Sequence, residues 1–323
     1  MNAPAKIVIL DRETLPPDIR LDRFDFPHLL ESYDRTDPDE VAGRIRHAQI
    51  VITNKVRVGG ADLQAAAELR LVAVAATGTD VVDLRQCQER SIAVCNIRNY
   101  AVHTVPEHTF ALIFALRRSV VAYHNSVARG RWEAAGQFCY FDYPIRDLAG
   151  STLGIIGDGV LGQAVGEMGK ALGLKVLYAA YKESKGMGPL YTPFEDVLRH
   201  SDILTIHCPL MESTRNLFGA AEFALMDRHP LVINTARGGI VEEAALADAL
   251  VSGQIGGAGF DVVTQEPMPH DHPFTKLMDR PDFILTPHVA WASREAIQTL
   301  VDQLIDNINA FTRGDLRNAV RAA

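Results

Sequence analysis

The chain has 323 residues, 47% of them hydrophobic, and a formal net charge of −8 at pH 7. The length predicts two domains with buried cores, and the negative charge argues against a nucleic-acid-binding surface, which needs concentrated Lys and Arg. No apolar run is long enough to cross a membrane. The four cysteines lie apart, without the CxxC spacing of metal or redox motifs, so we expect a cytoplasmic protein without a metal site.

Short runs rich in β-branched residues alternate with helical patterns along the chain. Such alternation predicts an α/β fold with parallel sheets covered by helices on both faces. The predicted strands lie at residues 6–10, 50–53, 71–75 and 92–96, and then at 152–156, 175–179, 203–207, 231–234, 257–261 and 283–286.

Two long helices are predicted. The first begins at a T-x-x-E capping box formed by Thr104 and Glu107 and continues to a C-cap near Gly130. The aromatic-rich segment after it, which includes Trp132, is typical of either core packing or a subunit contact. The second helix begins near Ser293 and carries an apolar stripe suited to core packing. Its return to the first lobe would supply a helix that this lobe otherwise lacks.

The strongest local motif is Gly157-x-Gly159-x-x-Gly162, which follows one predicted strand and opens a helix that leads to the next strand. This is the dinucleotide-binding fingerprint in its required context, and it predicts NAD(H) or NADP(H) as cofactor. The first glycine allows a tight turn, the second lets the pyrophosphate approach the backbone, and the third lets helix and strand pack closely. Val160 and Leu161 form the helix N-terminus expected to face the phosphates.

The end of the second strand departs from the NAD pattern, because Ala180 stands where an acidic residue usually binds the ribose 2′-hydroxyl. Lys182 and Lys185 would then attract a 2′-phosphate, and NADP(H) would be accepted. Alternatively, both lysines are solvated and Glu183 binds the ribose. The sequence leaves both interpretations open.

Three polar residues follow strand patterns in the same half of the chain. Arg237 provides a planar guanidinium that can bind a carboxylate and polarise the adjacent carbonyl. His288 is a natural proton donor near neutral pH, and Glu266 beside it would stabilise the protonated imidazole. This constellation predicts reduction of a 2-keto acid by hydride transfer.

The order of motifs resembles the D-isomer-specific 2-hydroxyacid dehydrogenase family, closest to its glycerate dehydrogenase or hydroxypyruvate reductase branch. The motifs are TGTD (77–80), TVPEH (104–108), GIIGDGVLG (154–162), HCPL (207–210), INTARGG (233–239), GFDVVTQEP (259–267) and TPHVAWAS (286–293). The resemblance implies two doubly wound, Rossmann-like lobes with a cleft between them. Residues 1–100 plus 291–323 would form a flavodoxin-like substrate domain, and residues 101–290 the dinucleotide-binding domain of a homodimer.

The resemblance also implies which residues bind ligands. Cofactor contacts are expected at Thr104, Pro209, Thr235, Ala236, Arg237, Asp261 and His288, and substrate contacts at Arg237, His288 and the backbone of Thr77, Gly78 and Thr79. We expect Lys55 to be solvated rather than in contact with an anionic substrate, and Trp132 to pack at an interface rather than reach a neighbouring subunit's cleft. Trp291 either lines the pocket or packs at the hinge, and His207 fits a core or turn position.

The expected reaction is NAD(P)-dependent reduction of a small 2-keto acid, hydroxypyruvate or glyoxylate in preference, to a D-2-hydroxy acid. A formate dehydrogenase would need Gln in place of Glu266. A phosphoglycerate-type dehydrogenase and a nucleotide-sensing, corepressor-like binding protein remain as alternatives.

Overall fold

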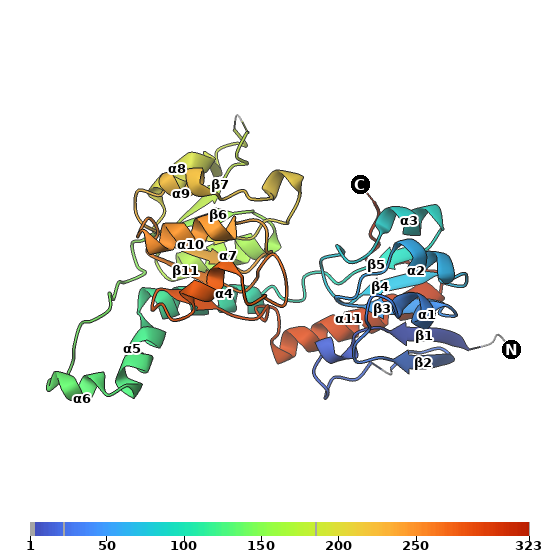
Figure 1. Ribbon diagram of the computed structural model, residues 1–323. Helices are drawn as coiled ribbons and strands as arrows, with labels where there is room; N and C mark the ends of the chain where they lie inside the picture. Colours follow the sequence, from blue (N-terminus) through green and yellow to red (C-terminus); the bar gives the residue numbers. More distant parts are fainter. Residues whose placement is uncertain (1–3, 22, 185, 323) are drawn as a thin grey trace. The chain divides into compact units, whose positions relative to one another are not determined.

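The computed structural model describes residues 4–21, 23–184 and 186–322, so Lys185 lies outside the described residues (Figure 1). The chain divides into two compact units. Unit 1 consists of Met1–Tyr100 with Ser293–Ala323, and unit 2 of Ala101–Ala292. Each unit is built on a parallel sheet with helices on both faces, which confirms the predicted α/β fold class.

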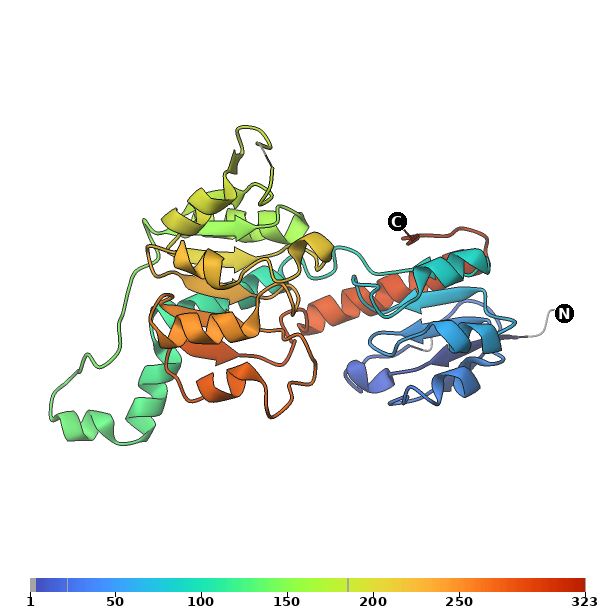
Figure 2. The ribbon, with the colours of Figure 1, turned by 45° about the horizontal axis from the view of Figure 1, so that its top comes forward.

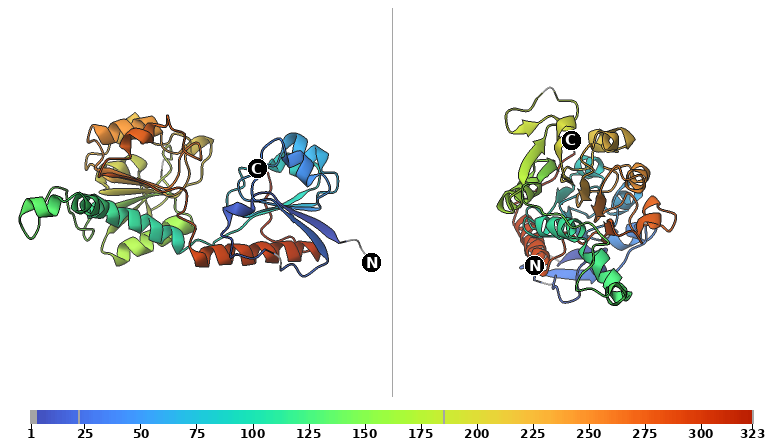
Figure 3. Two further views of the ribbon diagram at one scale, coloured as in Figure 1. Left: turned by 60° about the horizontal axis from the view of Figure 1, so that its bottom comes forward. Right: turned by 90° about the vertical axis from the view of Figure 1, so that its left-hand side faces the viewer.

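In unit 1 the described strands follow the order β2-β1-β3-β4-β5, and every pairing is parallel. This is the flavodoxin-like order. The strands are β1 (Ala5–Ile9), β2 (His28–Ser32), β3 (Ile50–Thr53), β4 (Leu71–Val74) and β5 (Ala93–Cys95). Helices α1 (Val41–Ile45), α2 (Gly60–Ala65) and α3 (Leu84–Glu89) cover one face, and α11 (Arg294–Thr312) lies along the other (Figure 3).

Helix α11 begins where the sequence predicted. The Ser293 hydroxyl accepts the backbone N–H of Ala296 at 3.0 Å, which makes Ser293 the N-cap. Leu300, Leu304 and Ile308 on the predicted stripe are fully buried. The sheet of unit 1 therefore obtains the cover for its second face from a helix that follows unit 2 in the sequence.

In unit 2 the described strands follow the order β12-β11-β10-β9-β6-β7-β8, again all parallel (Figure 2). The order reverses between β6 and β9, which is the switch point where doubly wound folds bind dinucleotides. The strands are β6 (Thr152–Ile156), β7 (Lys175–Ala179), β8 (Tyr191–Thr192), β9 (Ile203–Ile206), β10 (Leu231–Asn234), β11 (Gly257–Phe260) and β12 (Phe283–Leu285).

Two hydrophobic cores hold the helices of unit 2 against this sheet. Helices α4 (Thr104–Arg117) and α7 (Val160–Ala171) cover one face through Phe110, Ile113 and Val165. The other face is covered by α8 (Phe194–His200), α9 (Ala220–Ala224), α10 (Glu243–Val251) and the 3-10 helix η3 (Pro273–Leu277). Side chains of both cores alternate along the strands, as a sheet buried on both faces requires.

The predicted long helix after residue 103 differs from the structure in two respects. Its N-cap is His103, without a side-chain capping bond, so the capping box of Thr104 and Glu107 is wrong; Thr104 is already helical. The helix is also interrupted at Ser119, which has a left-handed φ of +51° and donates its hydroxyl to the Pro144 carbonyl. A separate helix, α5 (Val120–Ala128), follows and ends before Gly130, whose φ of +81° confirms the predicted C-terminus.

Helix α6 (Arg131–Ala135) comes next, and α5 and α6 extend away from the sheet of unit 2 (Figure 1). The edge strands β2 and β8 were not predicted, because β2 is only partly buried and β8 has two residues. None of the described helices combines the length and the apolar composition needed to cross a bilayer.

Candidate active site

The predicted residues of unit 2 gather at the carboxyl edge of its sheet. Gly157 follows β6, Pro209 lies in the loop after β9, and Thr235 to Arg237 follow β10. Asp261 directly follows β11, and His288 lies just beyond β12. Because these strands are parallel, their carboxyl ends share one edge, which is where doubly wound sheets bind ligands.

The glycine turn has the geometry that a dinucleotide requires. Gly157 has a φ of +97°, and a Cβ there would lie 2.6 Å from the Cys208 backbone nitrogen. A Cβ at Gly162 would lie 2.0 Å from the Gly157 carbonyl oxygen, so only glycine allows helix and strand to pack this closely. Gly159, the N-cap of α7, has open space where its Cβ would be. The turn therefore leaves a helix N-terminus accessible to a pyrophosphate, and the residues present fit the cofactor.

The segment after β7 carries Ala180 and Lys182, the two positions that bear on the choice between NADH and NADPH. Ala180 is buried, and its backbone N–H donates to the Thr192 carbonyl. The Lys182 ammonium lies 2.7 Å from Oε1 of Glu222, in an ion pair. Lys182 is therefore paired with a carboxylate of α9. Neither interpretation drawn from the sequence, a solvated lysine or one that binds a 2′-phosphate, included this ion pair.

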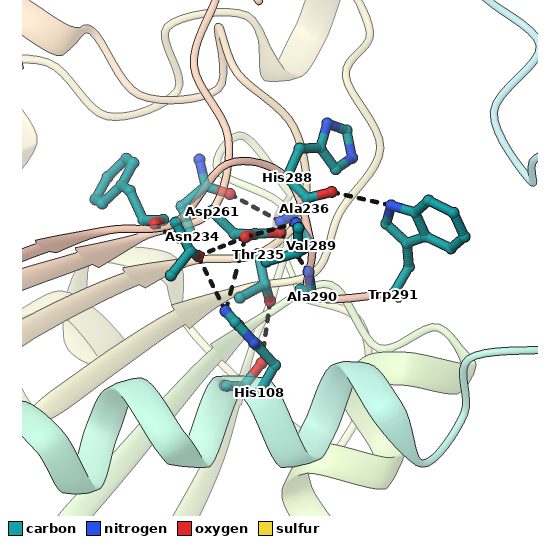
Figure 4. A network of polar contacts seen from close by, with 12 residues as sticks. His108, Asn234, Thr235, Ala236, Asp261, His288, Val289, Ala290 and Trp291 are labelled. Carbon is teal, nitrogen blue, oxygen red and sulfur yellow. Dashed lines mark hydrogen bonds and ion pairs between the residues drawn. The ribbon is translucent and has the colours of Figure 1, made fainter. Parts of the chain in front are cut away.

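Asp261 is the centre of a polar network behind the site (Figure 4). Its fully buried carboxylate accepts the backbone N–H groups of Val289 at 2.9 Å and Ala290 at 2.8 Å. It also accepts the hydroxyl of Thr286. Three donors along one short segment thus fix the loop that follows β12.

His108 on α4 completes this network, and sequence reasoning missed it. Its Nε2 lies 3.0 Å from the Thr286 hydroxyl and 3.7 Å from Asp261 Oδ1. Because the hydroxyl proton goes to the Asp261 carboxylate, Nε2 of His108 must donate to the hydroxyl oxygen. The only available signal was the position of His108 inside the TVPEH motif.

The network holds His288 in an uncommon backbone conformation. His288 has a φ of +54°, which costs a non-glycine residue about 1 kcal/mol. Its backbone N–H donates to the Asp261 carbonyl at 2.8 Å, and its carbonyl accepts the indole N–H of Trp291 at 2.9 Å. The imidazole points away from the Asp261 network (Figure 4).

His288 and Glu266 form the pair that the sequence predicted. Nδ1 of the imidazole lies 2.7 Å from Oε2 of Glu266, and both side chains are partly exposed. An ionised carboxylate only accepts hydrogen bonds, so Nδ1 carries a proton. Nε2 is then the nitrogen that can give or take a proton toward a substrate.

Arg237 emerges from a turn fixed by Asn234. The Asn234 amide donates to the Arg237 carbonyl at 3.0 Å and accepts the Ala236 N–H at 3.0 Å. The guanidinium donates to the Ala236 carbonyl at 2.8 Å. Next in the chain is Gly238, where a Cβ would lie 2.0 Å from the Val263 carbonyl oxygen. The turn carrying Arg237 and the loop carrying Glu266 are therefore in direct backbone contact.

The other predicted residues have varied surroundings. Thr235 shares a hydrogen bond with Thr109 of α4 at 3.0 Å, and Thr104 is the first residue of that helix. The half-exposed indole of Trp132 in α6 donates to the Gln137 carbonyl. Thr77, Gly78 and Thr79 belong to unit 1, where they follow β4, and Lys55 follows β3.

His207 directly follows β9 and is partly buried, which agrees with the predicted core or turn position. Its Nε2 lies 2.9 Å from the Thr205 hydroxyl, whereas Nδ1 is buried without a partner among the described residues. Burial lowers the pKa of His207 to about 4. His207 is therefore neutral at pH 7.

A doubly wound sheet with a glycine turn at its switch point and a histidine–carboxylate pair on the same edge defines a nucleotide-dependent dehydrogenase. Comparisons with known proteins give the family. Residues 110–290 match the family model for the D-isomer specific 2-hydroxyacid dehydrogenase, NAD binding domain. The chain belongs to this family, and it is an NAD(P)-dependent D-2-hydroxyacid dehydrogenase.

Two curated relatives match over nearly their whole length. A glycerate dehydrogenase of Methylorubrum extorquens is 51% identical over 98% of this chain and 99% of the relative. A hydroxypyruvate reductase of Blautia hydrogenotrophica is 37% identical, with 98% and 99% covered. Among solved structures, the NADPH-dependent glyoxylate/hydroxypyruvate reductase of Sinorhizobium meliloti superposes with a TM-score of 0.83 at 26% identity, covering 98% of this chain and 97% of that one.

Proposed function

We propose that this dehydrogenase reduces hydroxypyruvate, and glyoxylate as a second substrate, to the corresponding 2-hydroxy acid. The observation that carries the proposal is the 2.7 Å contact between His288 and Glu266 on the nucleotide-binding edge. The choice of substrate is supported by the 51% identity to a glycerate dehydrogenase and the 37% identity to a hydroxypyruvate reductase.

In the proposed reaction, Arg237 binds the substrate carboxylate and polarises the neighbouring carbonyl oxygen. Hydride for C2 comes from the reduced nicotinamide when that cofactor is bound. Nε2 of His288 gives its proton to the oxygen that becomes the hydroxyl, while Glu266 stabilises the imidazolium through Nδ1. In oxidation the same nitrogen takes the proton back.

Other residues support this chemistry in the proposal. The first turn of α7 at Gly159, Val160 and Leu161 receives the pyrophosphate, and Pro209, Thr235 and Ala236 line the path of the cofactor along the strand ends. Asp261 holds the His288 loop through Val289 and Ala290, and in this proposal it would help to orient the nicotinamide of a bound cofactor. Participation of the Thr77–Thr79 backbone in carboxylate binding, with unit 1 as substrate domain, stays a prediction.

The direct test is turnover of the purified protein, followed by the absorbance of NADH or NADPH. Hydroxypyruvate, glyoxylate, pyruvate and oxaloacetate form the substrate panel, and hydroxypyruvate should give the highest kcat/KM. His288→Ala should lower kcat by about 10²- to 10⁴-fold because the proton donor is lost. His47→Ala, an exposed histidine of unit 1, is the matched control. Full turnover in the His288 variant would refute the proton-donor role.

We further propose that NADPH is accepted alongside NADH. The basis is Ala180, which places no carboxylate where a 2′-phosphate would lie. Ala180→Asp should lower kcat/KM for NADPH about tenfold or more through like-charge repulsion and leave that for NADH nearly unchanged. A wild-type enzyme that already discriminates strongly against NADPH would contradict the proposal.

We also propose a cytoplasmic homodimer. All four cysteines are free thiols, as expected in a reducing compartment. The arm formed by α5, α6 and residues 136–147 exposes Trp132, Phe138 and Phe141, the last two more than 80% exposed. Exposed aromatic side chains in such number are typical of a protein interface.

A further inference from the structure

One carboxylate, that of Glu243, forms hydrogen bonds with both ends of the loop that carries Glu266. Glu243, the first residue of α10, accepts the backbone N–H of Thr264 through Oε1 at 2.6 Å. Its Oε2 lies 2.8 Å from Nε2 of His272. Thr264 lies two residues before Glu266 and His272 six residues after it, so Glu243 joins the two ends of the segment 264–272.

The far end of this segment is anchored in the core. Nδ1 of His272 accepts the backbone N–H of Phe274 at 3.1 Å, and the Phe274 side chain is fully buried. Because Nδ1 accepts, Nε2 of His272 carries the proton and donates it to Glu243. The side chains of His272 and Glu243 are only 5% and 13% exposed, so water competes little for these contacts.

Both partners of Glu243 are hydrogen-bond donors. A carboxylate satisfies both at once, whereas an amide offers only one acceptor oxygen and would turn its NH₂ group toward the second donor. An ionised carboxylate at this position therefore fits the geometry and a glutamine does not. Glu266 lies inside the closed segment, with its Oε1 3.3 Å from the Val263 N–H and its Oε2 on His288.

We propose that Glu243 is a positioning residue for catalysis: by fixing Thr264 and His272, it holds Glu266 within hydrogen-bond distance of His288. This inference rests on the proposed roles of Glu266 and His288. In this proposal Glu243 acts through the loop, by its contacts with Thr264 and His272. A displacement of about 1 Å at a catalytic pair lowers turnover up to 10²-fold. Loss of the two hydrogen bonds to Glu243 should therefore lower kcat measurably.

The test is a double-mutant cycle on hydroxypyruvate reduction. Glu243→Ala should lower kcat about tenfold and leave KM for hydroxypyruvate within about twofold, because Arg237 still binds the carboxylate. In a Glu266→Gln background the same change should lower kcat less than twofold, since the group being positioned is already gone. Glu243→Gln, which keeps one of the two contacts, should lie between wild type and Glu243→Ala.

Glu242→Ala is the matched control, an exposed glutamate one position earlier, and should keep wild-type kcat. The rate of backbone hydrogen exchange over residues 262–274 should rise in both Glu243→Ala and Glu243→Gln. This measures the loss of the hydrogen bonds to Glu243 even if one variant is poorly stable. An unchanged kcat in Glu243→Ala, or the same tenfold loss in the Glu266→Gln background, would overturn the inference. If Glu266→Gln itself keeps full kcat, the proposed role of Glu266 fails, and this inference fails with it.

Discussion

At the scale of single residues, the site depends on buried polar groups that never need to touch the substrate. The Asp261 carboxylate accepts two backbone N–H groups and a hydroxyl, and these contacts offset the unfavourable φ of His288. Glu266 then sets which imidazole nitrogen is free for proton transfer. Rigid support of this kind is what keeps a proton donor within reach of its acceptor.

His207 makes the stability of the protein depend on pH. Its folded-state pKa is about 4, against an ordinary value near 6.5, so between these values the unfolded chain binds a proton that the folded chain does not. The free energy of unfolding should therefore fall by about 3 kcal/mol as the pH falls from 6.5 to 4. Thermal unfolding at pH 7 and pH 4.5 should show a smaller drop in His207→Gln than in wild type. Equal drops would contradict the lowered pKa.

At the scale of elements, the loops after β10 and β11 work as one unit because their backbones touch. Gly238→Ala would place a methyl group 2.0 Å from the Val263 carbonyl oxygen and separate the turn of Arg237 from the loop of Glu266. We expect kcat to fall up to about 100-fold. Gly43→Ala in α1, where a Cβ meets nothing within 4 Å, is the control and should keep full activity. Normal turnover in the Gly238 variant would show that the two loops move independently.

The sequence predicted the elements that have a local signal. The buried strands consist of β-branched runs, and the glycine turn and the Ser293 cap are each encoded within a few residues. The break at Ser119 has no glycine or proline to mark it and depends on a contact with Pro144, 25 residues later. The role of Glu243 was equally hidden, because its partners Thr264 and His272 lie 21 and 29 residues away.

The candidate site shows the same division. Arg237, Glu266 and His288 could be proposed from the sequence because each follows a strand with a residue type suited to the chemistry. His108 was missed, because its partner Thr286 lies 178 residues away and only the fold brings α4 against β12. Residues that support a site through tertiary contacts leave little trace in one sequence.

At the scale of the whole molecule, the arm of α5 and α6 is the testable surface. If it forms the proposed dimer, Phe138→Asp with Phe141→Asp should convert the protein to a monomer, because charge replaces aromatic side chains at the interface. Light scattering coupled to size-exclusion chromatography measures this directly. Leu29→Asp on β2, an exposed apolar residue of unit 1, is the control and should leave the mass unchanged. A dimer that survives the double substitution would place the interface elsewhere.

The path of the chain has a consequence for biosynthesis. Unit 2 is one continuous stretch, Ala101–Ala292, whereas unit 1 needs α11, which a ribosome makes only after all of unit 2. The nascent chain can therefore complete its nucleotide-binding half while one face of the β1–β5 sheet, including the fully buried Ile7 and Leu71, still lacks its helix. That half-covered sheet is the species on which chaperones would act during translation.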